Sequence, residues 1–494
     1  MRSLTCVHGI DINPFAAAIA RFRLLLAAMQ AADIKRLADA PAFALQIACG
    51  DSLLHSSMIR DAPATQTGLD MAGLNEAAAP TKKNRGGMAA KAKTAADDEA
   101  CDHVYAAENL DVLRRLLQRG QYHAVVANPP YITPKDPILN ERYRKRFGSC
   151  HMKYSLSVPF LEQIFLLAAP GGFTGQITAN SFMKREFGTK LIESFFPTVD
   201  LTHVIDTSGA YIPGHGTPTV ILFGRRRDPV APTVRAVLGI RGEPITPADP
   251  TQGLVWTAIT QQVDHAGSAS DYVSVADTPR PSFHLHPWSI GGGGAAELKE
   301  QLDSLENGSL NDCIKSVGFS AILGQDEAFG APFDSTRISL LRRELRRPII
   351  EGDHVRDYEL SWATEVIFPY SEAIDLLDEP DIRRWLWNLR TTLGSRADFS
   401  KRTYAECGRP FWEYHQIPID RNRIPFSIAY AEVATHNHFV LDRGGKAFKQ
   451  TAPVITLSAD ATEQDHLELL GILTSTIACF WLQQSCHNKG RPGA

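Results

Sequence analysis

The fold is decided by residues 122–131, which read Tyr-His-Ala-Val-Val-Ala-Asn-Pro-Pro-Tyr. The first six form a short apolar run, which predicts a buried strand of a parallel sheet. Asn128, Pro129, Pro130 and Tyr131 follow directly. Open α/β sheets bind ligands beside the carboxyl ends of their strands, so these four residues are candidate site residues.

The chemistry that suits this strand end is methylation of a planar amino nitrogen such as adenine N6. The Asn128 oxygen and a backbone carbonyl can each accept one amino proton, which localises the nitrogen lone pair toward a methyl donor. Pro129 and Pro130 lack an N–H group and fix φ, so the turn is rigid and rich in acceptors. Tyr131 offers a ring on which an extruded base can stack. The alternative is an ordinary strand-ending turn, in which Asn and Pro are common.

Two acidic residues end earlier predicted strands. The strand at residues 5–11 closes with Asp11, and the strand at 44–49 is followed by Asp51. Asp11 is placed to bind ribose hydroxyls of a nucleoside, or alternatively to cap the following helix. Asp51 is placed to face the adenine of a cofactor or to orient a substrate base, although Gly-Asp-Ser is also a common turn. With Asn128, these residues would form three polar tips along one rim of the sheet.

Alternating strand and helix patterns predict an α/β fold with a doubly wound, mostly parallel sheet. The last two predicted strands have no helix pattern between them, which suggests a terminal antiparallel hairpin. The predicted helices are 110–119, 158–169 and 182–196, and the predicted later strands are 173–178, 201–206 and 219–223.

Composition changes divide the chain into three parts. Residues 1–230 form the predicted catalytic domain, and within it residues 61–100 are a low-complexity insertion. Residues 231–310 are a predicted connector, rich in Pro, Gly and Asp at its start. Residues 311–494 are a predicted mixed α/β module rich in arginine and aromatic residues.

Bulk properties exclude several classes of protein. The net charge of −4 over 494 residues leaves nucleic-acid binding to local basic patches. The eight cysteines contain no C-x-x-C pair, so they predict reduced thiols of a cytoplasmic protein, with no metal site. Arg21 and Arg23 interrupt the apolar stretch 15–29, so neither a signal peptide nor a membrane anchor is expected. Instead, helical spacing gives that stretch one apolar face, made of Phe15, Ile19, Phe22, Leu26 and Met29.

Taken together, these segments resemble the adenine-specific DNA methyltransferases, especially the large enzymes of type IIG and phage-exclusion (BREX/Pgl) systems. The resemblance rests on segments 8–16, 50–54 and 128–131, with support from 179–182, 207–218, 434–439 and 470–475. It implies a Rossmann-like methyltransferase domain that uses S-adenosyl-L-methionine. It further implies a C-terminal target-recognition module that binds double-stranded DNA with a flipped adenine.

The resemblance also assigns roles to individual residues. Asp11 and Ile12 would bind the cofactor ribose, and Asp51 and Ser52 would line the cofactor adenine pocket. Residues 128–131 would hold the target adenine. Recruitment of other defence-system subunits is implied as well, while no membrane partner is expected.

One feature of the family is missing from this sequence. The family carries a glycine-rich cofactor loop after a first, central strand, and the ten residues before Asp11 contain no such loop. We therefore expect this chain to be truncated at its N-terminus, with two sheet edges left without their shared partner. Two alternatives share the motif: a protein glutamine methyltransferase, and a non-catalytic DNA-binding fragment of such an enzyme.

Two clusters could contact nucleic acid. Arg225, Arg226 and Arg227 follow the last predicted strand and would meet phosphates or form a solvated charge run. The stretch 411–415, Phe-Trp-Glu-Tyr-His, mixes aromatic groups with nearby arginines, as nucleic-acid surfaces do. A buried aromatic core with flanking arginines is an equally good interpretation of this second cluster.

Overall fold

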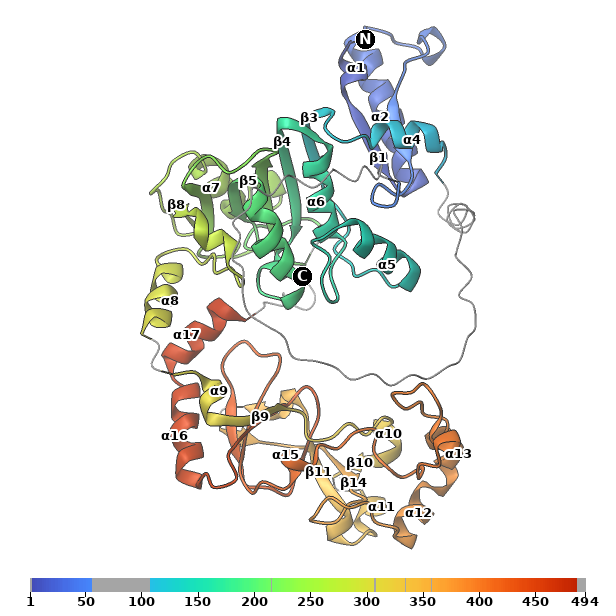
Figure 1. The fold of residues 1–494 in the computed structure, drawn as a ribbon, viewed down its shortest axis with the longest axis vertical. Coiled ribbons are helices and arrows are strands. Elements are labelled where there is room, and N and C mark those ends of the chain that lie inside the picture. The colour runs from blue at the N-terminus through green and yellow to red at the C-terminus, as the bar shows by residue number, and fades with distance from the viewer. Residues whose placement is uncertain are drawn as a thin grey trace, which may run out of the picture. The chain divides into compact units, whose positions relative to one another are not determined.

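The computed structural model describes residues 2–55, 107–214, 216–305, 308–333, 335–356 and 358–486. They form two compact units, one extending to Gly294 and the other covering Ala295–Cys486 (Figure 1). The low-complexity insertion predicted at 61–100 lies outside the described residues.

The first unit contains two sheets (Figure 1). A parallel pair joins β1 and β2. A six-stranded sheet has the order β3-β4-β6-β5-β7-β8, in which β3, β4, β5 and β7 run in one direction and β6 and β8 in the other. The strands are β1 (His8–Asp11), β2 (Gln46–Cys49), β3 (Tyr122–Ala127), β4 (Ala168–Ala179), β5 (Asp200–Asp206), β6 (Thr219–Arg225), β7 (Thr233–Gly239) and β8 (Val273–Pro279).

Some helices of the first unit begin at a residue whose side chain caps them. Asn13 accepts a hydrogen bond from the Phe15 N–H at 2.9 Å, and Pro14 occupies the first helical position of α2. Asn109 caps α4 in the same way through the Val112 N–H at 3.0 Å. The helices are α1 (Arg2–Cys6), α2 (Pro14–Ala31), α4 (Leu110–Leu116), α5 (Pro137–Arg146), α6 (Ser157–Leu167) and α7 (Leu254–Gln262).

Most residues of the apolar face that was predicted for α2 do not pack against the sheet. Ala17 and Met29 are its buried residues, and Ala17 packs against Ile47 and Cys49 of β2. Four of the five residues of the predicted apolar face, those from Phe15 to Leu26, are exposed. By length and composition alone α2 could cross a membrane. Its Arg21 nevertheless donates to the Ile47 carbonyl at 2.8 Å, which fixes the helix to the sheet.

Three predictions about the first unit need correction. The antiparallel pair β5–β6 exists, but it is not terminal, because β7 and β8 extend the sheet beyond β5. These two strands come from the segment predicted as a connector, so the compact unit ends at Gly294 and not near residue 230. The helix predicted at 182–196 is a series of short 3₁₀ and π turns.

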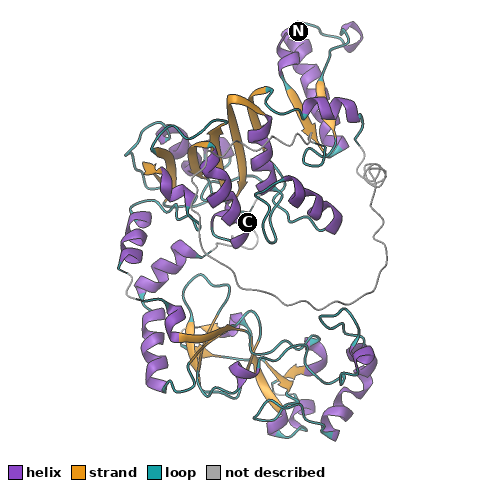
Figure 2. Ribbon diagram, in the orientation of Figure 1, coloured by secondary structure: helices purple, strands orange, loops and turns teal. Residues whose placement is uncertain are grey.

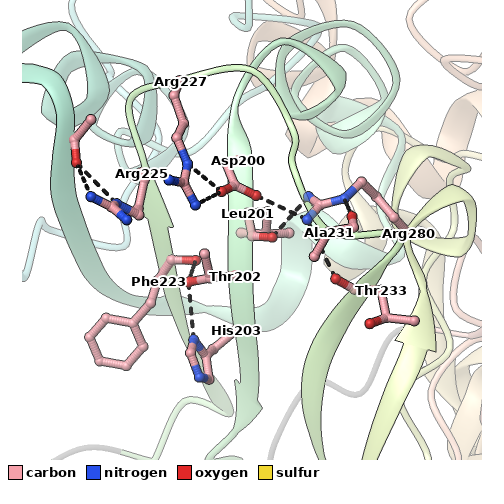
Figure 3. Close-up of polar contacts among 11 residues, drawn as sticks. Asp200, Leu201, Thr202, His203, Phe223, Arg225, Arg227, Ala231, Thr233 and Arg280 are labelled. Carbon is pink, nitrogen blue, oxygen red and sulfur yellow. Dashed lines mark hydrogen bonds and ion pairs between the residues drawn. The ribbon is translucent and has the colours of Figure 1, made fainter.

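A cluster of ion pairs around Asp200 stabilises the large sheet at the start of β5 (Figure 3). Asp200, at the start of β5, is 2% exposed. Its carboxylate oxygens form ion pairs with the guanidinium groups of Arg280 at 3.0 Å and Arg227 at 2.8 Å. Arg280 also donates to the carbonyls of Ala231 at 2.6 Å and Leu201 at 2.9 Å. One guanidinium therefore connects β5 with the segments before β7 and after β8.

The arginine run 225–227 forms hydrogen bonds and an ion pair within the same sheet, a role that the sequence did not indicate, although Arg227 is also exposed to solvent. Arg225 donates to the Gly171 carbonyl, and its guanidinium carbon lies 4.4 Å from the centroid of the Phe173 ring. Arg226 donates to the Ala168 carbonyl at 2.8 Å. Arg227 forms an ion pair with Asp200. Because all three guanidinium groups already have partners within the protein, they are poorly suited to binding phosphates.

The second unit is mixed α/β, as predicted, with two four-stranded sheets and a short hairpin (Figure 2). The sheet orders are β10-β14-β11-β17 and β16-β15-β18-β9, and β12 pairs with β13. The strands are β9 (Ile314–Gly318), β10 (Gly330–Pro332), β11 (Arg346–Ile350), β12 (Val355–Arg356), β13 (Glu359–Leu360), β14 (Thr364–Ile367), β15 (Ser427–Tyr430), β16 (Phe439–Asp442), β17 (Ala447–Phe448) and β18 (Val454–Leu457). The helices are α8 (Ala295–Ser304), α9 (Leu310–Cys313), α10 (Asp326–Phe329), α11 (Thr336–Ser339), α12 (Pro380–Leu386), α13 (Arg390–Gly394), α14 (Tyr404–Cys407), α15 (Ile419–Asn422), α16 (Glu463–Leu473) and α17 (Thr476–Ser485).

Candidate active site

Asn128 lies directly after β3, at the carboxyl end of the strand, and is exposed. The Tyr131 hydroxyl donates to the Asn128 Oδ1 atom at 3.0 Å, which fixes the orientation of the carboxamide. An amide oxygen has two lone pairs, so Oδ1 can accept a second hydrogen bond from a ligand. Pro129 is buried and Pro130 is exposed. The turn is therefore anchored at one proline and open to solvent at the residues on either side.

Tyr131 is half-buried, and burial raises the pKa of its hydroxyl. The hydroxyl therefore remains a proton donor throughout the physiological range, as its bond to Asn128 requires. Just beyond it, the Leu156 N–H donates to the Ile132 carbonyl at 2.8 Å, so the chain after the turn is tied to the start of α6.

Asp11 ends β1 with its side chain exposed. Its Oδ1 atom accepts the Asn13 N–H at 2.7 Å. Within the described residues no hydrogen bond reaches the other oxygen, Oδ2, which is free for an outside donor. Asp11 thus supports the chain before α2 and presents an acceptor at the strand end. It does not cap the helix, because the N-cap of α2 is Asn13. Ile12 beside it is 65% exposed.

Asp51, in contrast, is buried and already bonded. Its Oδ1 atom accepts the backbone N–H groups of Leu53 at 2.8 Å and Leu54 at 2.9 Å. Its Oδ2 atom accepts the hydroxyl of Tyr143, a buried residue of α5. The carboxylate holds the turn after β2 in shape, with the half-buried Ser52 on that turn.

Helix α5 connects the two parts of the candidate site, and sequence reasoning missed it. Besides the Tyr143 bond to Asp51, Arg146 donates to the Leu53 carbonyl at 3.1 Å. The helix follows Tyr131 by only a few residues, so the segment after the Asn128 turn returns to the Asp51 turn. A buried tyrosine seven residues into a polar, arginine-rich helix gives little indication of this contact in the sequence.

Among the described residues, Asp11, Asp51 and Asn128 do not follow strands of a single continuous sheet. Asp11 and Asp51 lie at the ends of the parallel pair β1–β2, whereas Asn128 follows β3, the edge strand of the six-stranded sheet. Helix α4 bridges the two sheets, because Leu113 and Leu116 pack in one cluster with Ala48 of β2 and Tyr122 of β3. The outward edges of β1 and β3 have no strand partner within the described part of the chain.

The aromatic stretch at 411–415 is part of a core, which decides between its two interpretations. Tyr414 is 1% exposed, and its hydroxyl donates to the Ile367 carbonyl at 2.5 Å. Trp412 donates through Nε1 to the Leu377 carbonyl at 3.0 Å. Arg396 donates to the carbonyls of Phe411 and Glu413. These side chains stabilise the second unit and are not available for stacking on bases.

An α/β sheet that presents Asn-Pro-Pro-Tyr at a strand end agrees with the methyltransferase interpretation of the sequence. Comparisons with known proteins bear on this interpretation. Residues 5–212 match the family described as Eco57I restriction-modification methylase. The chain is similar to the adenine-specific methyltransferase PglX of Streptomyces coelicolor, with 44% identity over 99% of this chain and 40% of that protein. The chain is thus similar to an adenine-specific methyltransferase, which confirms the resemblance inferred from the sequence.

Other similarities are more distant. The type II methyltransferase M.XhoI of Xanthomonas vasicola is 23% identical over 53% of this chain and 47% of that protein. The solved structure of the type IIL restriction-modification enzyme MmeI in complex with DNA has a TM-score of 0.48 and 11% identity, covering 75% of this chain and 44% of that one. This chain spans less than half the length of the curated relatives it matches.

Proposed function

We propose that this chain contains the catalytic site of a DNA methyltransferase that transfers a methyl group from S-adenosyl-L-methionine to adenine N6. The observation that carries the proposal is the exposed Asn128 carboxamide at the end of β3, held by the Tyr131 hydroxyl. Its free lone pair points to a use outside the protein, because the turn itself needs only the bond to Tyr131.

The proposed step depends on hydrogen bonding to the amino group of a flipped adenine. Asn128 Oδ1 and the Pro129 carbonyl would accept its two protons, which draws the nitrogen lone pair out of the ring and toward the donor. Tyr131 would contribute its ring face to hold the base. Alignment of donor, nitrogen and acceptors is the main requirement, so no general base is assigned.

The cofactor supplies an electrophilic methyl group when bound. The residues present would suit its ribose and adenine groups. Asp11 offers the free Oδ2 acceptor that a ribose hydroxyl needs, with the exposed Ile12 beside it. Asp51 is bonded to its own turn and to Tyr143, so its contribution would be to hold the shape of the adenine pocket that Ser52 helps to line.

The decisive test is methyl transfer by the protein as its natural gene encodes it, with labelled S-adenosyl-L-methionine and duplex DNA. The Asn128→Ala variant should lose about 10²–10³-fold in kcat, while its affinity for DNA changes little. Tyr131→Phe is the matched variant, because it keeps the ring and removes only the hydroxyl that orients Asn128. It should show a smaller loss.

The same assay separates the proposal from its alternatives. Label in N6-methyladenine supports it, whereas label in a protein glutamine would favour the protein methyltransferase. DNA binding without any transfer by the natural gene product would favour a non-catalytic fragment. Adenine methylation that persists in the Asn128→Ala variant would show that the role given to Asn128 is wrong.

A further inference from the structure

Two glutamines are buried in the core of the first unit, where helix α6 packs against β3 and β4 (Figure 1). Gln163 of α6 is 2% exposed, and Gln176 of β4 is 1% exposed. Burying an amide group costs free energy unless its donor and acceptor atoms are hydrogen-bonded. The bonding of each amide therefore shows whether its position in the core has a structural explanation.

Neither amide is fully hydrogen-bonded within the described residues. Both amide atoms of Gln163 lack a partner, whereas Gln176 lacks one only at Oε1. The Nε2 atom of Gln176 donates to the Ser157 carbonyl at 2.9 Å. A leucine would remove the unsatisfied atoms at either position, so stability alone favours an apolar residue at both. The two glutamines differ in one respect, because only Gln176 holds another segment of the chain.

Gln176 lies beside the end of the strand that carries the proposed catalytic turn, residues 128–131. In the parallel register of β3 and β4 it is the partner of Ala127, the last residue of β3. Ala127 packs against the cluster that contains Val158 of α6, and Gln176 bonds to the same helix. Both side chains therefore lie on the face of the sheet that α6 covers, directly behind the turn.

The bond from Gln176 is connected to the turn 128–131 through the start of α6. Ser157 is the first residue of α6, and Leu156 is its N-cap, which makes no side-chain cap bond. The Leu156 N–H donates to the Ile132 carbonyl at 2.8 Å, and Ile132 directly follows the turn. The side chain that holds the first turn of the helix thus also restrains the segment that leaves the turn.

We propose that Gln176 is a positioning residue for methyl transfer. Its amide holds the start of α6, and α6 holds the segment after Tyr131, whose hydroxyl orients the Asn128 carboxamide. The inference rests on the proposed function and adds a buried residue that acts through the backbone. Displacing a reacting group by about 1 Å can cost on the order of 10²-fold in rate, which gives a reason to keep a half-bonded amide in the core.

The experiment compares Gln176→Leu with Gln163→Leu in the protein as its natural gene encodes it. Methyl transfer is measured with labelled S-adenosyl-L-methionine and duplex DNA, and stability is measured by thermal melting. Gln176→Leu should lower kcat about ten-fold with little change in the KM for either substrate. Its Tm should stay equal or rise, because an unsatisfied buried acceptor is removed.

Gln163→Leu is the matched control, because it removes an equally buried amide that holds no other segment. It should raise the Tm and leave kcat unchanged. Gln176→Glu is the conservative variant, since a protonated carboxyl can donate to the Ser157 carbonyl and a carboxylate cannot. Its kcat relative to the unchanged protein should therefore rise as the pH is lowered, whereas the same ratio for Gln176→Leu should not depend on pH.

Hydrogen exchange gives a measurement that does not depend on activity. The Leu156 amide is hydrogen-bonded to the Ile132 carbonyl, so its exchange reports how firmly the segment after the turn is held. Without substrates, this amide should exchange faster in Gln176→Leu than in the unchanged protein. In Gln163→Leu it should exchange at the unchanged rate.

Three results would overturn the inference: an unchanged kcat in Gln176→Leu, equal Leu156 exchange in the two leucine variants, or a Tm for Gln176→Leu well below that of the unchanged protein. The last result would show that the amide serves stability. Absence of adenine methylation by the unchanged protein would instead overturn the proposed function. In that case faster Leu156 exchange in Gln176→Leu alone would still show that Gln176 holds the turn.

Discussion

Replacing Arg280 with Met should destabilise the first unit strongly, because this arginine is the central donor of the Asp200 cluster. The side chain is 7% exposed and donates to Asp200, Ala231, Leu201 and Thr233. Methionine keeps most of the apolar stem and removes the charge and all of these hydrogen bonds. The Asp200 carboxylate would remain buried with only one of its two cationic partners.

The magnitude follows from what remains after the substitution. Removing one partner of a buried ion pair costs about 3–5 kcal/mol. Arg227 still contacts Asp200 at 2.8 Å, so the lower end, about 3 kcal/mol, is expected. Arg227→Met is the matched control, since its side chain is 38% exposed and Arg280 stays on Asp200. Its expected cost is about 1 kcal/mol.

Differential scanning calorimetry of the whole chain measures the effect and locates it. For a unit of this size, about 3 kcal/mol corresponds to a Tm decrease of roughly 6–12 °C. The second unit provides an internal control, because its unfolding transition should not move. A transition of the first unit that shifts no more in Arg280→Met than in Arg227→Met would refute the assignment of Arg280 as the central donor.

Two more predictions concern the first unit. Tyr143→Phe leaves the Asp51 Oδ2 atom without its donor, so stability should fall by about 1–2 kcal/mol. In the natural gene product the KM for S-adenosyl-L-methionine should rise several-fold with little change in kcat, and an unchanged KM would exclude the positioning role. Burial raises the pKa of the Cys150 thiol to about 12. The unfolded thiol ionises first, so this stabilising contribution is complete below about pH 8.5 and is lost as the pH rises toward 12. In iodoacetamide labelling at pH 9, Cys150 should react far more slowly than the exposed Cys313, and equal rates would contradict this.

Much of the first unit could be predicted from local patterns. The strand before Asn128 was predicted, because a strand and the polar group that ends it depend on residues within a few positions. Its predicted burial was wrong, since no residue of β3 is buried. The α/β character of the sheet followed from the alternation of strands and helices. The family resemblance rested on the same short segments.

Other features depended on contacts between distant residues. The apolar periodicity of α2 predicted that its large side chains would pack against the sheet. Instead the helix contacts β2 through Ala17, whose small side chain allows close packing. Strands β7 and β8 were predicted as connector sequence, and only the pairing of β7 with β5 and of β8 with β7 made them part of the sheet. The arginine run ending at Arg227 resembled a charged surface, yet its partners come from residues as far away in sequence as Leu166.

The sequence by itself determined which chemical groups stand at the strand ends, because a strand, its turn and the helix cap that follows are local in the chain. It also determined the class of protein through those groups. Tertiary structure alone decided that Tyr143 holds Asp51 and that Arg280 neutralises Asp200. Such outcomes depend on which charged and polar groups meet after the chain has folded, and residues up to 92 positions apart in sequence carry no local signal of that meeting.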